Sequence, residues 1–225
     1  MLTDLRRALR KVADPTKAAG MRAYMKSAMP YHGVPNPLLR RVCKQVFANA
    51  DLATSPGWQA LVLELWRNAR FREERYAALL LAGDRRARAF QTPGTLRMYE
   101  ELVVTGAWWD YVDDVASRRI GPILRDHPLP MRRKMLAWSK CADMWKRRSS
   151  IICQLGFKHE TDLDLLYACI EPSLGSREFF LQKAIGWALR QYAWVDGAEV
   201  KRYVRLNQAR LSALSRREAL KNLVS

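Results

Sequence analysis

The stretch "SPGWQALVLELWRNA", residues 55–69, spaces its large apolar side chains three and four positions apart. That period places them on one face of an α-helix, and no comparable alternating run in the chain suggests a strand. A serine followed by a proline opens the stretch. This is a typical helix start, because serine can cap free N–H groups and proline suits the first turn. The stretch therefore predicts an amphipathic helix in an all-helical fold.

The same start signal recurs through the first half of the chain. A capping side chain stands directly before a proline at four places: Asp14-Pro15, Asn36-Pro37, Ser55-Pro56 and Thr92-Pro93. Segments of helical period lie between these places and continue through the second half. The last of them, "SRREALKNLV", places Ser215 and Glu218 at the spacing of a capping box. We expect about a dozen helices of roughly 10–18 residues with short connections.

The helix rhythm also predicts an architecture. Paired helices of this length would recur about every 35–45 residues, which is the period of HEAT-type units. Stacked pairs form a curved solenoid with an extended concave face. We therefore predict an all-α, HEAT-like helical-repeat solenoid, with residues 1–225 as a single domain. Because the chain is strongly basic, its concave face should be positive, and the natural ligand of such a face is a rod of negative charge such as duplex DNA. We therefore also predict a concave basic DNA-binding cleft.

The charge of the chain favours a polyanionic partner. Its 225 residues include 39 Lys and Arg against 22 Asp and Glu, a formal net charge of +17. Residues 1–100 hold 18 basic and 8 acidic side chains, and residues 101–225 hold 21 and 14. The excess is therefore spread along the folded body, which excludes a detachable basic tail. Nucleic acid is the first candidate partner and an anionic membrane surface the second, and a charged surface also serves solubility.

The cysteines and histidines predict neither a disulfide framework nor a metal site. Four cysteines form no CxxC pair, and three histidines are scattered without metal-ligand spacing. We expect reduced thiols, no zinc and a cytoplasmic, nucleoid-associated monomer. The N-terminus lacks the apolar core of a signal peptide, and no run reaches the ~18 apolar residues that span a bilayer. We therefore expect a soluble, unexported protein, and a membrane is not among the partners that we predict.

Acid and aromatic side chains gather in "VVTGAWWDYVDDVASRR". On a helix Trp108 joins an apolar stripe that faces the core, while Trp109 and Asp113, four positions apart, share the next strip around. Two interpretations stay open. Trp109 and Asp113 are a functional pair, or Trp109 is a second core aromatic and Asp113 a surface charge that pairs with Arg118 or Arg119.

Two further stretches place cations beside aromatic or apolar side chains. In "LQKAIGWALRQYA", Lys183, Trp187 and Arg190 follow i, i+4, i+7 spacing, which suits a surface that meets phosphates. In "DMWKRRSSIICQL", Arg148 interrupts a row of apolar groups and needs an anionic partner. That partner is either a phosphate or a protein carboxylate, unless the side chain bends out to solvent.

These stretches together resemble a known family. "ELVVTGAWWDYVDD", "MWKRRSSIICQL", "REFFLQKAIGWALRQYA" and "LSRREALKN" are similar to the AlkD-like family of DNA alkylation repair glycosylases, and the similarity runs through essentially the whole chain. The resemblance implies a HEAT-like solenoid that holds alkylated DNA in its concave cleft. It also implies hydrolysis of the N-glycosidic bond of the damaged nucleotide without base flipping, unlike most glycosylases.

The resemblance carries roles onto individual residues. It implies a catalytic cleft formed by Trp109, Asp113 and Trp187. It also implies contacts to the DNA backbone by Arg148 and by Tyr24, Met25 and Lys26. The spacing of cations around Trp187 adds Lys183 and Arg190 to this set. Asp114 follows Asp113 where relatives often have a small polar residue, and this change removes no required group.

The chemistry fits these residue types. Alkylation at N3 of adenine or N7 of guanine makes the base cationic and weakens its glycosidic bond. As the bond breaks, charge moves onto the deoxyribose, where Asp113 would stabilise it and place the attacking water. The faces of Trp109 and Trp187 would select a cationic nucleotide.

We therefore expect a monofunctional alkylpurine DNA N-glycosylase, a hydrolase of base excision repair that needs no metal, nucleotide or redox cofactor. Its substrates would be N3-methyladenine, N7-methylguanine and bulkier adducts in double-stranded DNA. The alternatives are a non-catalytic DNA-binding or protein scaffold and a repeat protein that binds an acidic protein or a membrane surface. The glycosylase hypothesis fails if Asp113 lies buried against an arginine and out of reach of DNA.

Overall fold

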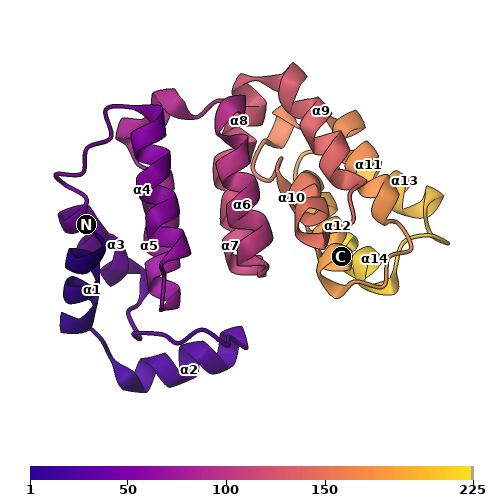
Figure 1. The fold of residues 1–225 in the computed structure, drawn as a ribbon. Coiled ribbons are helices and arrows are strands. Elements are labelled where there is room, and N and C mark those ends of the chain that lie inside the picture. The colour runs from indigo at the N-terminus through magenta and orange to yellow at the C-terminus, as the bar shows by residue number, and fades with distance from the viewer. Residues whose placement is uncertain (224–225) are drawn as a thin grey trace. The chain divides into compact units, whose positions relative to one another are not determined.

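A computed structural model of the chain describes residues 1–223, and this part contains only helices and their connections (Figure 1). It holds fourteen α-helices, four 3-10 helices and one π-helix. The prediction of an all-α, helical-repeat fold is confirmed. Some helices are shorter than expected, such as α8 (Gly121–Asp126) with 6 residues. That helix ends early because Pro128 occupies the first position of the next one.

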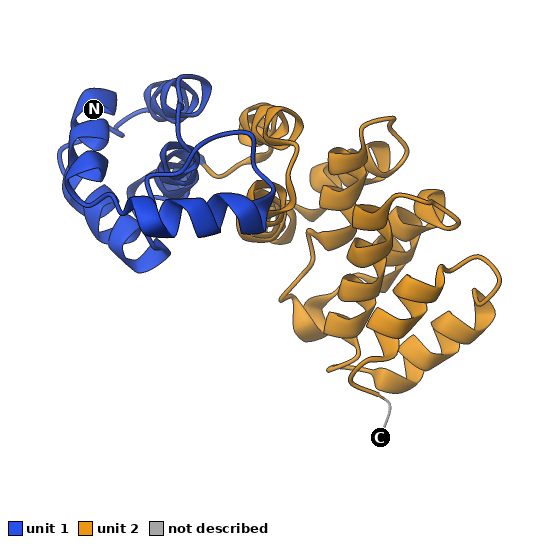
Figure 2. Ribbon diagram, turned by 90° about the horizontal axis from the view of Figure 1, so that it is seen from below, with its two compact units in different colours: residues 1–90 blue, residues 91–225 orange. Residues whose placement is uncertain are grey.

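Contacts between Cα atoms divide the chain into two compact units, Met1–Phe90 and Gln91–Ser225 (Figure 2). Each unit has its own buried apolar side chains, so each has its own core. The single domain and the concave basic cleft stay predictions. No helix among residues 1–223 is long and apolar enough to cross a bilayer.

Unit 1 consists of α1 (Leu2–Lys11), α2 (Pro15–Met25), α3 (Asn36–Val46), α4 (Ser55–Arg67), α5 (Arg72–Ala82) and the 3-10 helix η1 (Arg85–Phe90). Helix α4 lies beside α5, and α3 packs on α1 and α5 (Figure 1). Trp58 of α4 is fully buried, and its indole N–H donates to the Leu81 carbonyl at 3.0 Å. The helix predicted from residues 55–69 is therefore confirmed, and its apolar face forms part of this core.

A buried carboxylate anchors the loop that precedes α3. Glu73 accepts the backbone N–H groups of His32, Gly33 and Val34 at 3.0, 2.9 and 3.1 Å. Gly33 adopts φ +80°, and a Cβ atom there would lie 1.9 Å from the Asp14 carbonyl oxygen. Only glycine fits this position, because both the backbone conformation and the space exclude a side chain.

The neighbouring Glu74 ties α5 to α1 and to the same loop. Arg6 donates to Glu74 at 3.2 Å, and so does the Arg70 N–H at 2.8 Å. Burial alone would raise the pKa of Glu74, but the nearby His32 imidazole, with Nε2 at 3.8 Å, and hydrogen bonds from Arg70 and Arg6 lower it to about 2. Glu74 is therefore ionised inside the fold.

Unit 2 consists of η2 (Pro93–Thr95), α6 (Leu96–Gly106), α7 (Trp109–Val115), the π-helix η3 (Ala116–Ile120), α8, α9 (Pro128–Ser139), α10 (Met144–Ile152), η4 (Lys158–Glu160), α11 (Leu163–Ile170), η5 (Glu171–Ser173), α12 (Phe179–Tyr192), α13 (Gly197–Leu206) and α14 (Ala213–Leu220). Helix α7 packs against α6 and α10, α10 against α12, and α12 against α14. On α12 the apolar side chains of Leu181, Ile185 and Leu189 are buried, and that of Tyr192 is half-buried. This succession of packed helices positions the candidate site.

The predicted helix starts hold to within one residue. Asp14 caps α2, because its carboxylate accepts the N–H groups of Thr16 and Lys17. Asn36 and Ser55 are instead the first residues of α3 and α4, one position inside the helix. Thr92 is the N-cap residue of the 3-10 helix η2, which begins at Pro93.

The capping box predicted for the last helix is wrong. Ser212 caps α14 by accepting the N–H of Ser215, and the helix begins one turn earlier than the box requires. The Ser215 hydroxyl donates to the Gln182 carbonyl of α12 at 2.9 Å. Glu218 likewise forms ion pairs with side chains of α12. Both side chains therefore join two helices instead of closing a helix end.

Candidate active site

The Asp113 carboxylate of α7 is held by the Arg148 guanidinium of α10. Nε donates to Oδ1 at 2.7 Å, and Nη2 donates to Oδ2 at 2.8 Å. The Asp113 side chain is 14% exposed and that of Arg148 is 5% exposed. A bidentate, charge-assisted pair fixes both the position and the orientation of the carboxylate. Asp113 is therefore set against an arginine, yet part of it remains open to a ligand.

Arg148 also reaches a third helix. Its Nη1 donates to the Phe180 carbonyl at the start of α12. One side chain thus joins α7, α10 and α12. Its anionic partner is a protein carboxylate, which is one of the alternatives that the sequence left open. A phosphate contact by Arg148 stays a prediction, and its burial leaves little surface for one.

The interpretation of Asp113 as a surface charge paired with Arg118 or Arg119 is wrong. Asp114 makes those pairs, with the Nε of Arg118 at 3.6 Å and the Nη2 of Arg119 at 3.2 Å. One step along an α-helix turns a side chain by about 100°. The two adjacent carboxylates therefore face different parts of the molecule.

The ionisation of Asp113 depends on its partner. Burial raises the pKa of the Asp113 carboxyl above its ordinary value, the hydrogen bonds and charge of Arg148 oppose that rise, and the nearby Asp110 adds to it. The guanidinium therefore keeps a desolvated carboxylate available as an anion.

The chain leaves α geometry directly after this aspartate. Ala116–Ile120 form the π-helix η3, and the Ser117 hydroxyl donates to the Asp113 carbonyl at 2.6 Å. Wide turns of this kind are rare and often lie at functional sites. The sequence predicts an unbroken helix here, since a π-turn leaves no mark on the hydrophobic period over so short a stretch.

The two adjacent tryptophans take different places. The Trp108 ring lies 5.5 Å from Phe180 and 6.4 Å from Trp145, so it belongs to an aromatic cluster between α7, α10 and α12. Trp109 begins α7, is half-buried and lies one turn before Asp113. It is therefore available on the strip of the helix that carries the carboxylate, as the functional interpretation requires.

Trp187 lies on α12, two helical turns after Phe180. Phe180 packs on Trp145 of α10 with ring centroids 5.0 Å apart. Trp187 follows Phe180 by seven residues, or two helical turns, and therefore shares that face. Its side chain is half-buried. The meeting of Trp109, Asp113 and Trp187 around one nucleotide stays a prediction.

The cations that flank Trp187 already have a partner. Glu218 of α14 lies 3.0 Å from the Lys183 Nζ and also forms an ion pair with Arg190. The hydrogen bond from Lys183 lowers the pKa of Glu218, although burial opposes this, and Arg190 contributes. DNA contacts by Lys183 and Arg190 stay predictions and would require exchange with Glu218. This role of Glu218 was not predicted from the sequence, because the residue also matches the spacing of a capping box.

Close packing of α12 on α14 explains the glycine of the "AIGW" motif. A Cβ atom at Gly186 would lie 2.5 Å from the Glu218 Cβ and 2.9 Å from the Ser215 carbonyl oxygen. The absence of a side chain at Gly186 therefore lets Glu218 reach both cations.

Tyr24, Met25 and Lys26, the remaining predicted DNA contacts, belong to unit 1. The Tyr24 side chain is 77% exposed, and Lys26 is exposed at the C-cap of α2 with φ +47°. Met25 between them is buried. Of the three, Tyr24 and Lys26 are therefore open to a ligand on the surface of unit 1.

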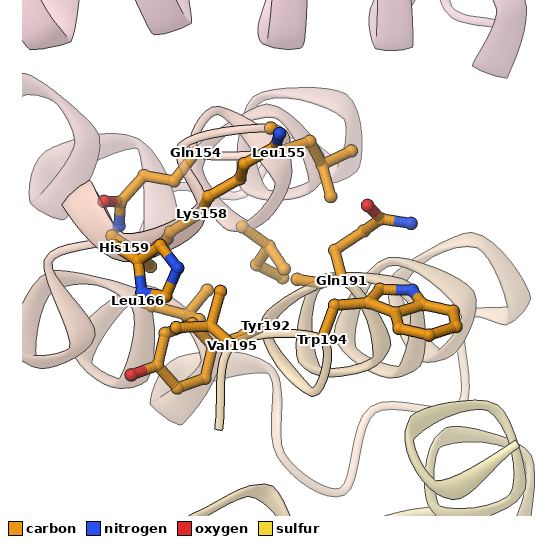
Figure 3. Close-up of a pocket in the computed structure, with 13 residues that line it drawn as sticks. Gln154, Leu155, Lys158, His159, Leu166, Gln191, Tyr192, Trp194 and Val195 are labelled. Atoms are coloured by element: carbon orange, nitrogen blue, oxygen red, sulfur yellow. The ribbon is translucent and has the colours of Figure 1, made fainter. Parts of the chain in front are cut away.

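A cavity of about 340 Å³ lies where α10 and α12 end. Gln191, one turn after Trp187, and the Trp194 indole lie on one side of it, and His159 lies on the other (Figure 3). Trp194 is 72% exposed, an unusual position for so large an apolar side chain. The residues around this cavity were not predicted from the sequence, because no local pattern shows that Trp194 is exposed.

The residues that could bind a metal are dispersed. Among residues 1–223, no group of three His, Cys, Asp or Glu side chains could hold an ion. The four cysteines are free thiols.

Comparison with known proteins identifies a matching family and a similar solved structure. The family model described as DNA alkylation repair enzyme matches residues 5–223. A solved structure described as "Predicted DNA alkylation repair enzyme from Enterococcus faecalis" shares 29% sequence identity, with a TM-score of 0.84 over 95% of this chain and 97% of that chain. Among curated proteins, none matches this chain.

Proposed function

Because the chain belongs to the DNA alkylation repair enzyme family, we propose that it is a DNA glycosylase that hydrolyses the N-glycosidic bond of cationic alkylated purines in duplex DNA. N3-methyladenine and N7-methylguanine are the proposed substrates. Bulkier adducts are included, because selection by charge without base flipping does not depend on a tight pocket. The products are the free base and an abasic site, as in base excision repair by a monofunctional enzyme.

The lesion itself activates the leaving group. When the bond between the base and C1′ breaks, its electron pair goes to the base and cancels the formal positive charge. The base therefore leaves neutral, without a proton from a general acid. Water oxygen then bonds to C1′ and loses a proton, which completes the hydrolysis. The protein must stabilise the cationic sugar and place the water.

Asp113 is suited to both tasks because Arg148 orients it. A carboxylate has about four lone-pair sites, and the two bonds from Arg148 leave capacity on each oxygen for a water molecule or a cationic sugar. A carboxylate fixed before the reaction stabilises the developing charge without reorganising. The partial exposure of its side chain supplies the access that this role needs.

Trp109 and Trp187 would recognise the cationic nucleotide. An indole face attracts a cation by about 0.5–2 kcal/mol, with the larger values where water is excluded. Both side chains are half-buried on helices that pack against α10. They would therefore favour the lesion over an uncharged purine without hydrogen bonds to base edges.

The observation that carries the proposal is the fixed Asp113–Arg148 pair in a chain of this family. The test measures release of methylated base from alkylated duplex DNA by the natural protein, Asp113→Asn and the matched control Asp114→Asn. Asp113→Asn should lose about 10²–10³ in single-turnover rate. Asp114→Asn should retain the rate, since its carboxylate serves Arg118 and Arg119.

Two outcomes would count against the proposal. Equal rates for Asp113→Asn and the natural protein would reject this mechanism. Salt-dependent DNA binding by the natural protein without base release from any alkylated duplex would favour a non-catalytic scaffold.

A further inference from the structure

A groove between α13 and α14 gathers positive charge away from the candidate active site. Its volume is about 640 Å³, and its lining contains five cationic side chains and no aspartate or glutamate. The cations are Lys201, Arg205, Arg216, Arg217 and Lys221.

Helix α14 presents this groove and the active-site region on different faces. Ser215 and Glu218 contact α12, as described above for Gly186. Arg217 and Lys221, four positions apart, share another face and line the groove opposite α13. Buried Val204 is among its apolar lining residues. One helix therefore separates the cations near Trp187 from those of the groove.

The groove cations lack the acidic partners that their neighbours have. On α13, Arg202 pairs with Glu199, and in the following loop Arg210 pairs with Glu171. Within residues 1–223, by contrast, no ion pair involves the four exposed groove cations, which are Lys201, Arg205, Arg217 and Lys221. Like charges that converge without a counter-charge repel one another, and an anion bound among them removes that cost.

One cation is fixed in place by the backbone. Arg216 donates from Nη1 to the carbonyls of Gln208 and Leu211, at 2.6 and 2.8 Å. These bonds hold the guanidinium at the groove but leave its positive charge uncompensated by an acid. The groove is thus a partly preorganised site for an anion, since one of its cations needs no ordering when the ligand binds.

We propose that this groove binds the phosphodiester backbone of duplex DNA beside the segment that occupies the active site. The inference rests on the proposed function, in which duplex DNA is the ligand. Lys201 and Arg205 on α13 are four residues apart, as are Arg217 on α14 and Lys221 at its C-cap, and four residues of helix rise by about 6 Å. Two steps along one DNA strand advance by about 7 Å. Each pair can therefore meet phosphates along a strand.

The position of the groove predicts that the protein contacts DNA beyond the lesion. A helix with its side chains is about 10 Å across, so the two faces of α14 are separated by about three base-pair steps of 3.4 Å. A duplex that covers only the lesion would not fill the groove. A duplex of about two helical turns would reach both the candidate active site and the groove.

The test uses a variant that removes four exposed groove charges, Lys201→Gln/Arg205→Gln/Arg217→Gln/Lys221→Gln. The matched control removes two arginines and two lysines that are exposed elsewhere in unit 2, Arg97→Gln/Arg133→Gln/Lys134→Gln/Lys140→Gln. Affinity for an undamaged duplex of about 20 base pairs is measured over a series of salt concentrations. Circular dichroism confirms that both variants are folded.

The groove variant should reduce the slope of log K against log salt by about 2–4, since each neutralised phosphate contributes about 0.9. Its affinity for the long duplex should fall at least tenfold, and its affinity for a duplex of half that length much less. The control should keep most of the slope. Equal slopes for the two variants would overturn the proposal. So would a groove variant that binds vesicles of anionic phospholipid more weakly than the natural protein but binds duplex DNA equally well.

Base release separates this inference from the proposed function. With alkylated long duplex, the groove variant should raise the protein concentration that gives half the maximal rate, whereas Asp113→Asn lowers the maximal rate itself. If no protein releases base, the glycosylase proposal fails, and the salt slopes still decide whether the groove binds DNA.

Discussion

Replacement of Arg148 by glutamine is expected to destabilise the protein strongly, because it leaves Asp113 desolvated without its partner. The substitution removes two charge-assisted bonds of 2.7 and 2.8 Å and the link to the Phe180 carbonyl. Breaking a buried pair by removing one partner costs about 3–5 kcal/mol. The pair of Arg125 and Glu160 serves for comparison, because it is exposed and exposed pairs contribute only about 0–1 kcal/mol to the free energy of unfolding.

Urea unfolding of Arg148→Gln, Asp113→Asn and the double variant would measure this cost, with Arg125→Gln as the control. The double variant should be less destabilised than the sum of the single variants, because it leaves no lone charge behind. A free energy of unfolding for Arg148→Gln within about 1 kcal/mol of the natural protein, as for an exposed pair, would refute the reasoning.

The same substitution should shift the pH dependence of base release. Burial already raises the pKa of Asp113, and Arg148 opposes that rise. The rate of the natural protein should therefore fall as pH decreases through a value above about 3.9, the ordinary aspartate pKa. Arg148→Gln should move this fall to higher pH, and Asp113→Asn should abolish it. An unshifted profile in Arg148→Gln would show that the arginine does not maintain the anion.

Three further predictions address other parts of the chain. Protonation of Glu74 should contribute a loss of about 3 kcal/mol of stability as pH falls from 4.5 to 2, because its folded pKa is about 2 and lies below its unfolded value. Glu74→Gln, unfolded in urea across this range, should therefore lose less stability than the natural protein by about this amount. Glu218→Gln should free two cations and steepen the salt dependence of DNA affinity by about 1–2 in slope, as measured by fluorescence anisotropy. Gly33→Ala should lower the free energy of unfolding by about 2–5 kcal/mol, as measured by thermal unfolding, because its Cβ would lie 1.9 Å from a backbone carbonyl oxygen. The control Gly20→Ala should be neutral or stabilising, because a Cβ atom there meets nothing within 4 Å.

The fold was predictable because its signals are local. The period of residues 55–69 and the cap at Asp14 each act within a few positions, and both are confirmed. Helix ends were less predictable, since Thr54 and Ser55 can both cap and only the backbone path selects Thr54. The π-turn of η3 was not predictable, because it inserts one residue without changing which side chains are apolar.

The partners within the candidate site were less predictable than its members. The sequence indicates that Arg148 needs an anion, but Asp113 lies 35 residues away and on another helix. Asp113 and Asp114 are adjacent and chemically identical, and the rotation of about 100° between them on the helix decides which one meets Arg148. In the same way, Glu218 matches a capping motif locally, and only the packing of α14 on α12 reveals its ion pairs.

Burial explains how an acidic site can persist in so basic a chain. Lys183 keeps 36% of its side chain exposed, so a phosphate can compete with Glu218 for it when DNA approaches. Arg148 is 5% exposed, and a phosphate cannot reach it without opening the junction of α7, α10 and α12. The pair of Arg148 and Asp113 should therefore survive DNA binding while more exposed pairs exchange. The carboxylate would then remain oriented toward the sugar throughout the reaction, although cations surround it and phosphates bind nearby.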